Sequence, residues 1–228
     1  MTCSVTLRRT SEVEDAVERL GRLGLDPHPD VREKSWDMCL ALESIIRDVP
    51  RTSRILDVGA RWSPILERLE LLGYQNIWAC DLERSWREDL RRVLRRSAVH
   101  FRRADLTDTG LPAASFDVVT SLSVIEHGVE PGAYIAEMAR LLRPGGFLIT
   151  STDMWCEPVP TDGIFPYGPR FGQMRVFTPE DIRQMIDRAE SHGLHLDGQL
   201  DLRCEDRVVT WARVGRSYTF TYFELRRE

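Results

Sequence analysis

Apolar runs of strand length alternate with stretches of helical spacing through the middle of the chain. The apolar runs cover residues 53–58, 76–81, 99–102, 116–122 and 146–152. The stretches of helical spacing cover residues 63–73, 88–96 and 132–142. Short apolar runs predict buried strands, and the helical stretches predict helices that cover them. Because parallel strands need such crossover helices, the alternation predicts an α/β fold with a mostly parallel sheet.

Two helices are predicted before the first strand. Ser11 and Glu14 have the spacing of a capping box, and apolar residues follow on one helical face. The segment 25–29 contains two prolines and interrupts this pattern. Asp30 and Glu33 again have capping-box spacing and predict the start of a second helix.

The C-terminal third departs from the strand–helix alternation. Residues 153–178 are rich in proline, glycine and aromatic residues, which is typical either of a lid over a binding site or of a surface excursion on the sheet edge. Thr178 followed by Pro179 predicts the start of a helix. The runs 208–214 and 218–225 have strand character and predict a hairpin that closes the sheet.

The composition is that of a folded globular protein with a negative net charge. Hydrophobic residues make up 42% and charged residues 29% of the 228 residues, and the formal net charge is −5. This charge gives no general attraction to nucleic acid or to an anionic membrane. Lys34 is the only lysine, which we interpret as the codon usage of a GC-rich genome. The arginine-rich stretch 84–103 also carries acidic residues, which favours a solvated helix face over a phosphate-binding patch.

Five cysteines are spread widely along the chain, at Cys3, Cys39, Cys80, Cys156 and Cys204. Their spacing fits neither a zinc knuckle nor a thioredoxin-like site. The sequence has no apolar signal segment and no stretch long enough to span a bilayer. We therefore expect free thiols in a cytoplasmic protein without a metal site.

The strongest local pattern for a binding site follows the first predicted strand. Asp57 and Gly59 end that strand, and the chain then turns into a helix predicted to start at Ser63. Ligands of open parallel sheets bind beyond the carboxyl ends of the strands, and glycine lets the backbone approach them closely. Free amides at a helix N-terminus attract a carboxylate or a phosphate. The same pattern also fits a plain strand–turn–helix connection.

Acidic residues also follow the second and third predicted strands. Asp81 is followed by Leu82, and Asp105 is followed by Leu106. Asp81 is placed to accept hydrogen bonds from both hydroxyls of a ribose, and Asp105 from an adenine amino group with Leu106 against the ring. Either acid alone also fits a turn aspartate that caps local amides. Three acids in register after successive strands favour the binding interpretation.

Two longer strings are the most specific in the sequence. Residues 115–127 resemble the fourth-strand motif of the class I S-adenosylmethionine-dependent methyltransferases, especially of members that act on small molecules. Residues 141–148 resemble the turn before the fifth strand of that family. The string 56–59 resembles its first motif, and Asp81 and Asp105 match its ribose-side and adenine-side acids.

The resemblance covers residues 50–228 and implies a three-layer Rossmann-like sandwich. Its seven-stranded, mostly parallel sheet would end in an antiparallel hairpin. Residues 1–49 would form a helical cap, and residues 153–178 a lid-like insertion. The implied cofactor is S-adenosyl-L-methionine. Its implied binding residues are Asp57, Gly59, Arg61, Ser63, Asp81, Leu82, Asp105, Leu106 and Ser121.

The first motif departs from the usual Gly-x-Gly-x-Gly pattern of the family. Only Gly59 is present, and Arg61 and Ser63 stand where glycines are usual. Arg61 either pairs with the methionine carboxylate of the cofactor or points to solvent. The departure bears on the affinity and orientation of the cofactor more than on the fold.

The implied function is methyl transfer to a small-molecule acceptor by in-line displacement, in which the protein aligns the reacting groups and excludes water. His127 is the first candidate for a general base, and capping of the following loop is its alternative role. Asp153 and Tyr167 are the other catalytic candidates. Trp155 and Phe171 are candidates for binding the acceptor, or for the core of the lid.

Three alternatives stay open. The same fold and cofactor also suit other sulfonium chemistry, such as a cyclisation that releases methylthioadenosine. A non-catalytic scaffold is favoured by the missing glycines and opposed by the three retained acids. A nicotinamide-dependent enzyme needs the glycine-rich fingerprint more strictly and is less favoured. We expect a monomer or homodimer whose partner is a small molecule, without nucleic acid or membrane partners.

Overall fold

The computed structural model describes residues 3–61, 63–82 and 99–228. The predicted helix 88–96 and most of the arginine-rich stretch 84–103 lie outside the described residues. None of the described helices has both the length and the apolar composition needed to cross a membrane.

Ten strands form one sheet over the described residues, in the order β4-β3-β2-β5-β6-β10-β1-β8, with β7 and β9 also paired to β10. The strands are β1 Cys3–Thr6, β2 Arg54–Val58, β3 Asn76–Asp81, β4 Val99–Arg103, β5 Phe116–Leu122, β6 Leu142–Met154, β7 Leu194–Leu196, β8 Gln199–Asp201, β9 Val209–Trp211 and β10 Arg216–Arg227. The predicted α/β class is confirmed, and the sheet has more strands than the seven expected.

The central strands are parallel, and their carboxyl ends meet at one edge of the sheet. β2 pairs with both β3 and β5, so that Val58 lies opposite Cys80 and Asp57 lies opposite Thr120. β4 continues the parallel arrangement beside β3. Because the strand order reverses between β2 and β5, the connections diverge there and leave room for a ligand.

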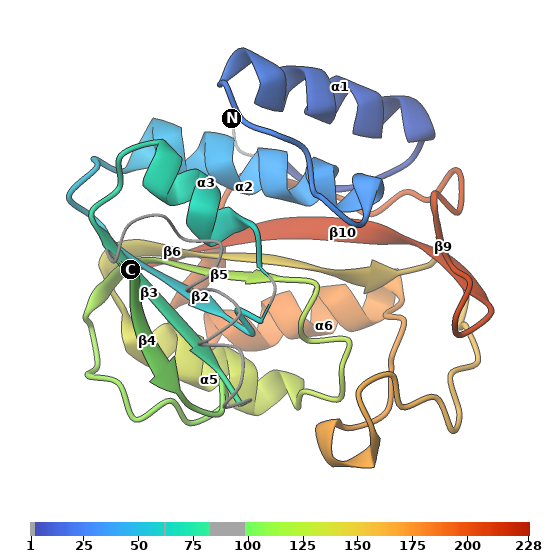
Figure 1. Cartoon of the computed structure of the whole chain (residues 1–228). Coiled ribbons are helices and arrows are strands. Elements are labelled where there is room, and N and C mark those ends of the chain that lie inside the picture. Colours follow the sequence, from blue (N-terminus) through green and yellow to red (C-terminus); the bar gives the residue numbers. More distant parts are fainter. Residues whose placement is uncertain (1–2, 62, 83–98) are drawn as a thin grey trace.

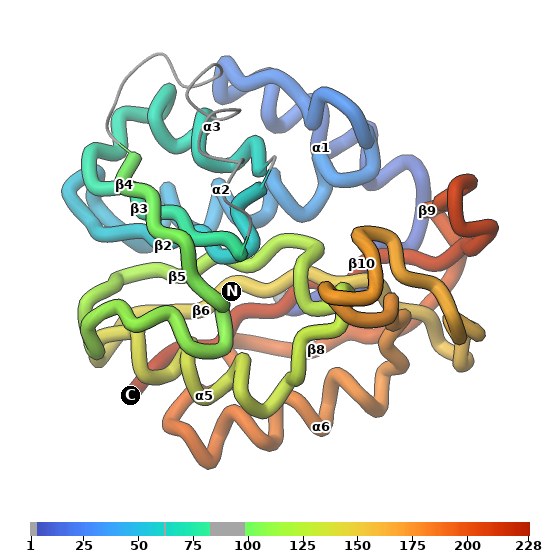
Figure 2. Tube along the Cα trace, turned by 60° about the horizontal axis from the view of Figure 1, so that its bottom comes forward, coloured from blue at the N-terminus to red at the C-terminus, as the bar shows by residue number. Residues whose placement is uncertain are grey.

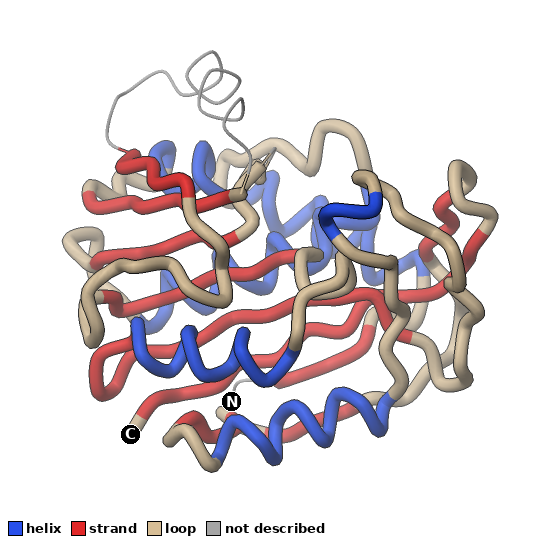
Figure 3. The backbone as a smooth tube through the Cα atoms, turned by 90° about the horizontal axis from the view of Figure 1, so that it is seen from below, coloured by secondary structure: helices blue, strands red, loops and turns tan. Residues whose placement is uncertain are grey.

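Helices cover both faces of the sheet and make the predicted three layers (Figure 1). On one face lie α2 Ser35–Asp48 and α3 Ile65–Leu71, with α1 Thr10–Arg22 packed outside α2, and on the other lie α5 Pro131–Leu141 and α6 Pro179–Glu190. Figure 3 shows helices in front of and behind the same strands. Each face buries its own apolar cluster, which explains why the central strands are apolar on both sides.

The N-terminal segment contributes a strand as well as helices. β1 lies between β10 and β8, antiparallel to β10 with Val5 opposite Tyr222. The helical cap expected over residues 1–49 is thus joined to the sheet through its first residues. The buried positions of this strand are the polar Ser4 and Thr6, whereas Val5 is only half-buried, so its pattern lacks the apolar face that predicts a strand.

The predicted caps of the first two helices are wrong in detail. Glu12 caps α1 by accepting hydrogen bonds from the backbone N–H groups of Arg8 and Arg9 at 2.6 and 2.9 Å, and Ser11 lies inside the helix. Before α2, Nδ1 of His28 accepts hydrogen bonds from two backbone N–H groups at 3.3 and 3.1 Å. A short 3-10 turn over Arg32–Lys34 then leads into α2.

The predicted helix start at Thr178 and the C-terminal hairpin are confirmed, but the hairpin does not end the sheet, because β1 and β8 lie beyond β10. Thr178 caps α6, its hydroxyl accepting from the backbone N–H of Asp181 at 3.2 Å while the Asp181 carboxylate accepts from the backbone N–H of Thr178 at 2.8 Å. β9 and β10 form the expected antiparallel hairpin, and β10 pairs with β6 along most of its length.

Cys156 and Cys204 form a disulfide, so the prediction that all cysteines are free thiols is wrong. The two residues are separated by 48 positions, and folding brings them together. The disulfide connects the start of the segment 153–178 to the loop between β8 and β9. Cys39 and Cys80 are free and buried.

Candidate functional site

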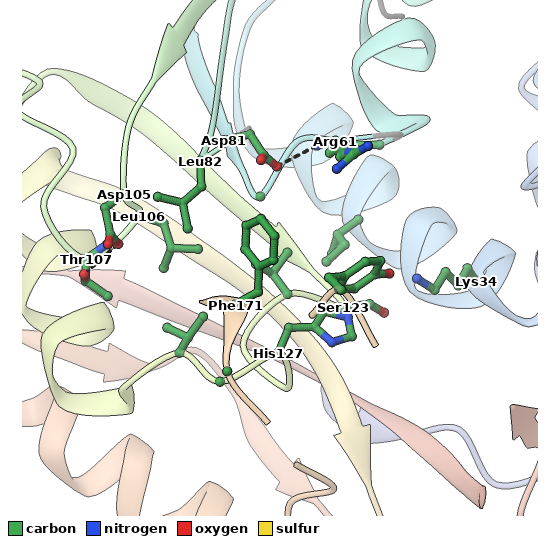
Figure 4. Close-up of a pocket in the computed structure, with 18 of the residues that line it drawn as sticks. Lys34, Arg61, Asp81, Leu82, Asp105, Leu106, Thr107, Ser123, His127 and Phe171 are labelled. Atoms are coloured by element: carbon green, nitrogen blue, oxygen red, sulfur yellow. Dashed lines mark hydrogen bonds between the residues drawn. The ribbon is translucent and has the colours of Figure 1, made fainter. Parts of the chain in front are cut away.

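A cavity of about 820 Å³ lies at the carboxyl ends of β2, β3, β4 and β5. Residues 28–38 and 167–172 form its other walls. Figure 4 shows Asp81 and Asp105 toward one end of the cavity and Lys34 and His127 at the other. We call these the Asp81 end and the Lys34 end.

The loop after β2 requires the glycine at position 59. Gly59 has a φ of +66°, and a Cβ atom on it would lie 2.4 Å from Cγ1 of Val124. The loop therefore packs directly on the chain that follows β5. α3 begins at Ile65, two residues later than predicted, and has seven residues. Ser63 lines the cavity as part of the loop and not as a helix start.

Asp81 ends β3 and faces the cavity. Its Oδ2 accepts a hydrogen bond of 3.0 Å from the backbone N–H of Arg61, drawn as a dashed line in Figure 4. This bond fixes the loop after β2 relative to β3. Leu82, which is 42% exposed, and Leu106 flank the same end and offer apolar surface to a planar ring.

Asp105 lines the cavity and also holds its own turn. Its Oδ1 accepts hydrogen bonds from the backbone N–H and the hydroxyl of Thr107, at 2.9 and 2.7 Å. The turn-capping role that the sequence allowed for this acid is therefore present alongside its place in the cavity wall.

Asp57 and Ser121 lie behind the wall of the cavity. Asp57 is 1% exposed and accepts a hydrogen bond of 2.6 Å from the hydroxyl of Thr120. Burial raises the pKa of Asp57 to about 7, against the opposing effect of hydrogen bonds from Thr120 and Ser63. Asp57 thus links β2, β5 and the loop, while Ser121 is fully buried within β5.

Ser123, just after β5, has an uncommon backbone conformation at the Lys34 end. Its φ is +53°, a value rare outside glycine and often found at functional loops. The side chain is 7% exposed, and its Oγ has no hydrogen-bond partner among the described residues. A buried hydroxyl without a partner costs about 1–3 kcal/mol, so a ligand that bonds to it gains affinity.

His127 follows in the same loop and faces the cavity. Its ring packs edge-on against Tyr167 with 4.8 Å between the ring centroids. Its Nδ1 is buried and has no hydrogen-bond partner within the part of the chain that the structure describes. Burial lowers the pKa of His127 to about 4, and the Lys34 ammonium acts in the same direction. The imidazole is therefore neutral at neutral pH and has one nitrogen that accepts a hydrogen bond.

The segment 153–178 reaches the loop after β5 through a close contact between two glycines, and residues 167–172 line the cavity. A Cβ atom on Gly128 would lie 2.5 Å from Cα of Gly172. Figure 2 shows this orange segment beside the loop that follows β5. Tyr167 and Phe171 lie in the cavity wall near this contact, and the lid role of the segment stays a prediction.

Asp153 and Trp155 are not brought to the cavity. Asp153 is 3% exposed and lies opposite Phe220 of β10, because it still belongs to β6. Burial holds its pKa well above its ordinary value, and the charge of Glu126 adds to this effect. Trp155 packs against the apolar core on the α2 side, with the guanidinium of Arg207 4.4 Å from its ring centroid.

The contribution of the N-terminal segment was missed by the sequence analysis. Lys34, Asp37 and Met38 all line the cavity. Asp37 is 1% exposed and accepts a hydrogen bond of 2.5 Å from the hydroxyl of Ser151, and burial raises its pKa to about 6. No motif marks these positions, and the one available signal was that Lys34 is the only lysine.

Known proteins share this fold and parts of this sequence. Residues 56–150 match a family model described as a methyltransferase domain. A ubiquinone biosynthesis O-methyltransferase of Xanthomonas axonopodis pv. citri is 36% identical over 110 residues, which cover 45% of this chain and 44% of that protein. The chain therefore matches less than half of the length of that relative.

Solved structures match over nearly the whole chain. The 1,6-didemethyltoxoflavin-N1-methyltransferase of Burkholderia thailandensis, solved with S-adenosylhomocysteine, has a TM-score of 0.61 at 19% identity and covers 97% of this chain and 92% of its own. The cyclase SpnF has a TM-score of 0.62 at 17% identity, with 99% and 98% covered. At such identities the likeness concerns the fold. Residues 56–150 thus resemble a methyltransferase domain in sequence, and the whole chain has the fold of class I S-adenosylmethionine-dependent methyltransferases.

Proposed function

We propose that this protein transfers the methyl group of S-adenosylmethionine to a small-molecule acceptor. The observation that carries the proposal is one cavity with two chemically different ends. Asp81 offers a carboxylate at one end, and Ser123 and His127 offer buried polar atoms without partners among the described residues at the other.

The Asp81 end fits the cofactor. The Asp81 carboxylate suits the two ribose hydroxyls, and Leu82 and Leu106 suit the faces of the adenine ring. Gly59 brings the loop after β2 close to the sheet edge, where a larger residue would meet Val124. In that loop Arg61 lines the cavity, where a positive charge complements the carboxylate of the methionine part.

The Lys34 end is where the acceptor would bind. The cofactor supplies an electrophilic methyl group on a sulfonium, and the chain has to orient the acceptor and exclude water. Tyr167 and Phe171 cover the cavity from the lid side. The neutral His127 would hold the acceptor through Nδ1 and receive a proton where the acceptor is protonated.

The surroundings of the Lys34 end favour a small acceptor. It is bounded by the segment leading into α2, by the loop after β5 and by the lid, which leaves room for a metabolite-sized group. The names of the curated relative and of the B. thailandensis enzyme describe methyltransferases of small molecules, which supports the same class here. A cytoplasmic location and a monomeric or homodimeric state stay predictions.

Transfer of a labelled methyl group tests the proposal. Protein is incubated with S-adenosyl[methyl-¹⁴C]methionine and a host extract separated into metabolites, proteins and nucleic acids. We expect label in the metabolite fraction together with S-adenosylhomocysteine. Asp81→Asn should lose this activity, whereas Asp162→Asn, an exposed acid of the lid outside the cavity, should keep it.

Other products would point to the alternatives. Methylthioadenosine without transferred label would indicate cyclisation or alkyl transfer on the same cofactor. Label confined to protein or nucleic acid would contradict a small-molecule acceptor. Absence of any product in all fractions would favour a non-catalytic protein.

A further inference from the structure

Lys34 places a positive charge without a direct salt-bridge partner among the described residues in the wall of the cavity. It lies in the 3-10 turn before α2, is half-buried and lines the cavity. Over the described residues, no carboxylate oxygen lies within 4.0 Å of its ammonium group, and the group forms no hydrogen bond. The ammonium group therefore has its hydrogen-bonding capacity open to a ligand in the cavity, and an anionic group placed there would gain a direct ion pair.

Two buried acids on which the Lys34 charge acts, Asp37 and Glu126, form their hydrogen bonds with other groups. The carboxylate of Asp37 accepts hydrogen bonds from the Ser151 hydroxyl at 2.5 Å and from the backbone N–H of Met38 at 2.9 Å. Glu126 accepts one of 2.9 Å from the hydroxyl of Thr152. Burial raises the pKa of Asp37 to about 6 and that of Glu126 to about 7, and the Lys34 charge opposes both shifts, as it opposes the raised pKa of Asp153.

The polar atoms without partners lie at the same end of the cavity as Lys34 (Figure 4). Ser123 is only 7% exposed, and its Oγ and the Nδ1 of His127 both lack partners among the described residues. Lys34, His127 and Tyr167 line the same cavity, and the Lys34 charge acts on the other two side chains. One ammonium, one hydroxyl and one neutral imidazole therefore face a single ligand group.

We propose that Lys34 selects an anionic acceptor, whose carboxylate or phosphate group pairs with the ammonium while Ser123 and His127 hydrogen-bond the polar part of the same molecule. This inference rests on the proposed function, because it assigns the acceptor end of the same cavity. It makes Lys34 a specificity-determining residue, and acceptors of equal shape without the negative charge bind more weakly.

The single lysine makes the test direct. Reductive methylation with ¹³C-formaldehyde labels Lys34 and the chain's amino terminus, and the dimethylated amine keeps its positive charge. In the presence of S-adenosylhomocysteine, the Lys34 NMR signal is followed during titration with benzoate, phenyl phosphate or neutral benzamide. We expect a saturable shift with at least one anion, at a Kd about tenfold below that of benzamide. Benzoate and phenyl phosphate separate the two sources of negative charge.

Variants repeat the comparison by calorimetry on the unlabelled protein. Lys34→Met should remove the preference for the anion, and Lys34→Arg should retain it. Arg183→Met removes a charge from an exposed position of α6 outside the cavity and should change nothing. Binding of S-adenosylhomocysteine by each variant shows that its fold and cofactor site are intact.

Three results would overturn the inference: equal binding of benzamide and the anions, an anion preference that survives in Lys34→Met, or no binding of any probe to the wild-type complex at millimolar concentration. Each leaves the proposed function standing so long as S-adenosylhomocysteine binds. Loss of that binding in the wild-type protein would instead contradict the proposed function.

Discussion

Replacement of Gly59 by alanine should destabilise the protein through two separable effects. The first is conformational, because an L-residue at a φ of +66° costs about 1–2 kcal/mol. The second is steric, because the new Cβ would lie 2.4 and 2.6 Å from the two methyl groups of Val124, and overpacking of this kind costs about 1–3 kcal/mol. Gly59→Ala should therefore lower the free energy of unfolding by about 2–5 kcal/mol, which lowers Tm by roughly 2–4 °C per kcal/mol.

Two further variants separate these effects in urea unfolding experiments. Gly73 has a φ of +85°, and a Cβ atom on it would meet no other atom within 4 Å, so Gly73→Ala should show the conformational cost alone. Val124→Ala in the Gly59→Ala background should recover the steric part, with a coupling energy of about 1–3 kcal/mol. Equal losses in Gly59→Ala and Gly73→Ala, or no recovery by Val124→Ala, would refute the close packing of the loop on the chain after β5.

Three other perturbations test separate parts of the structure. Burial raises the pKa of Asp57 to about 7 from its ordinary 3.8. Between about pH 4 and pH 7 the folded protein therefore keeps the Asp57 proton, whereas the unfolded chain loses it. The contribution of Asp57 to the free energy of unfolding falls as the pH rises through that window. Asp57→Asn should make the decline in unfolding free energy over this window shallower, and an unchanged slope would contradict the assignment. The disulfide between Cys156 and Cys204 closes a loop of 48 residues, so its reduction should lower the unfolding free energy by about 3–4 kcal/mol. Thermal or urea unfolding with and without dithiothreitol measures this difference. No effect of the reductant would show that the bond does not form. Gly128→Ala should push the lid away from the loop after β5 and speed tryptic cleavage at lid arginines, and cleavage at the wild-type rate would contradict the glycine contact.

The strands that position the site were predictable because their patterns are local. β3 and β5 lie where the apolar runs 76–81 and 116–122 predict them, since a strand buried on both faces reads as a continuous apolar run. Asp81 ends β3 and Asp105 follows β4, and both reach the cavity because the carboxyl ends of parallel strands lie at the same edge.

The features that were missed depend on contacts between distant segments. Asp37 is held by Ser151, which lies 114 residues later, and nothing near Asp37 in the sequence indicates that contact. The disulfide joins cysteines 48 residues apart, and its spacing matches no local motif. Asp153 was expected at the acceptor, but β6 extends through Met154 and keeps it inside the sheet.

The crystal structure of the complex with S-adenosylhomocysteine is the measurement that tests the central claim most directly. We predict that the ribose hydroxyls bind the Asp81 carboxylate and that the sulfur faces the space between His127 and Lys34. A ligand bound outside this cavity, or bound with its sulfur turned away from the Lys34 end, would contradict the division of the cavity into a cofactor end and an acceptor end.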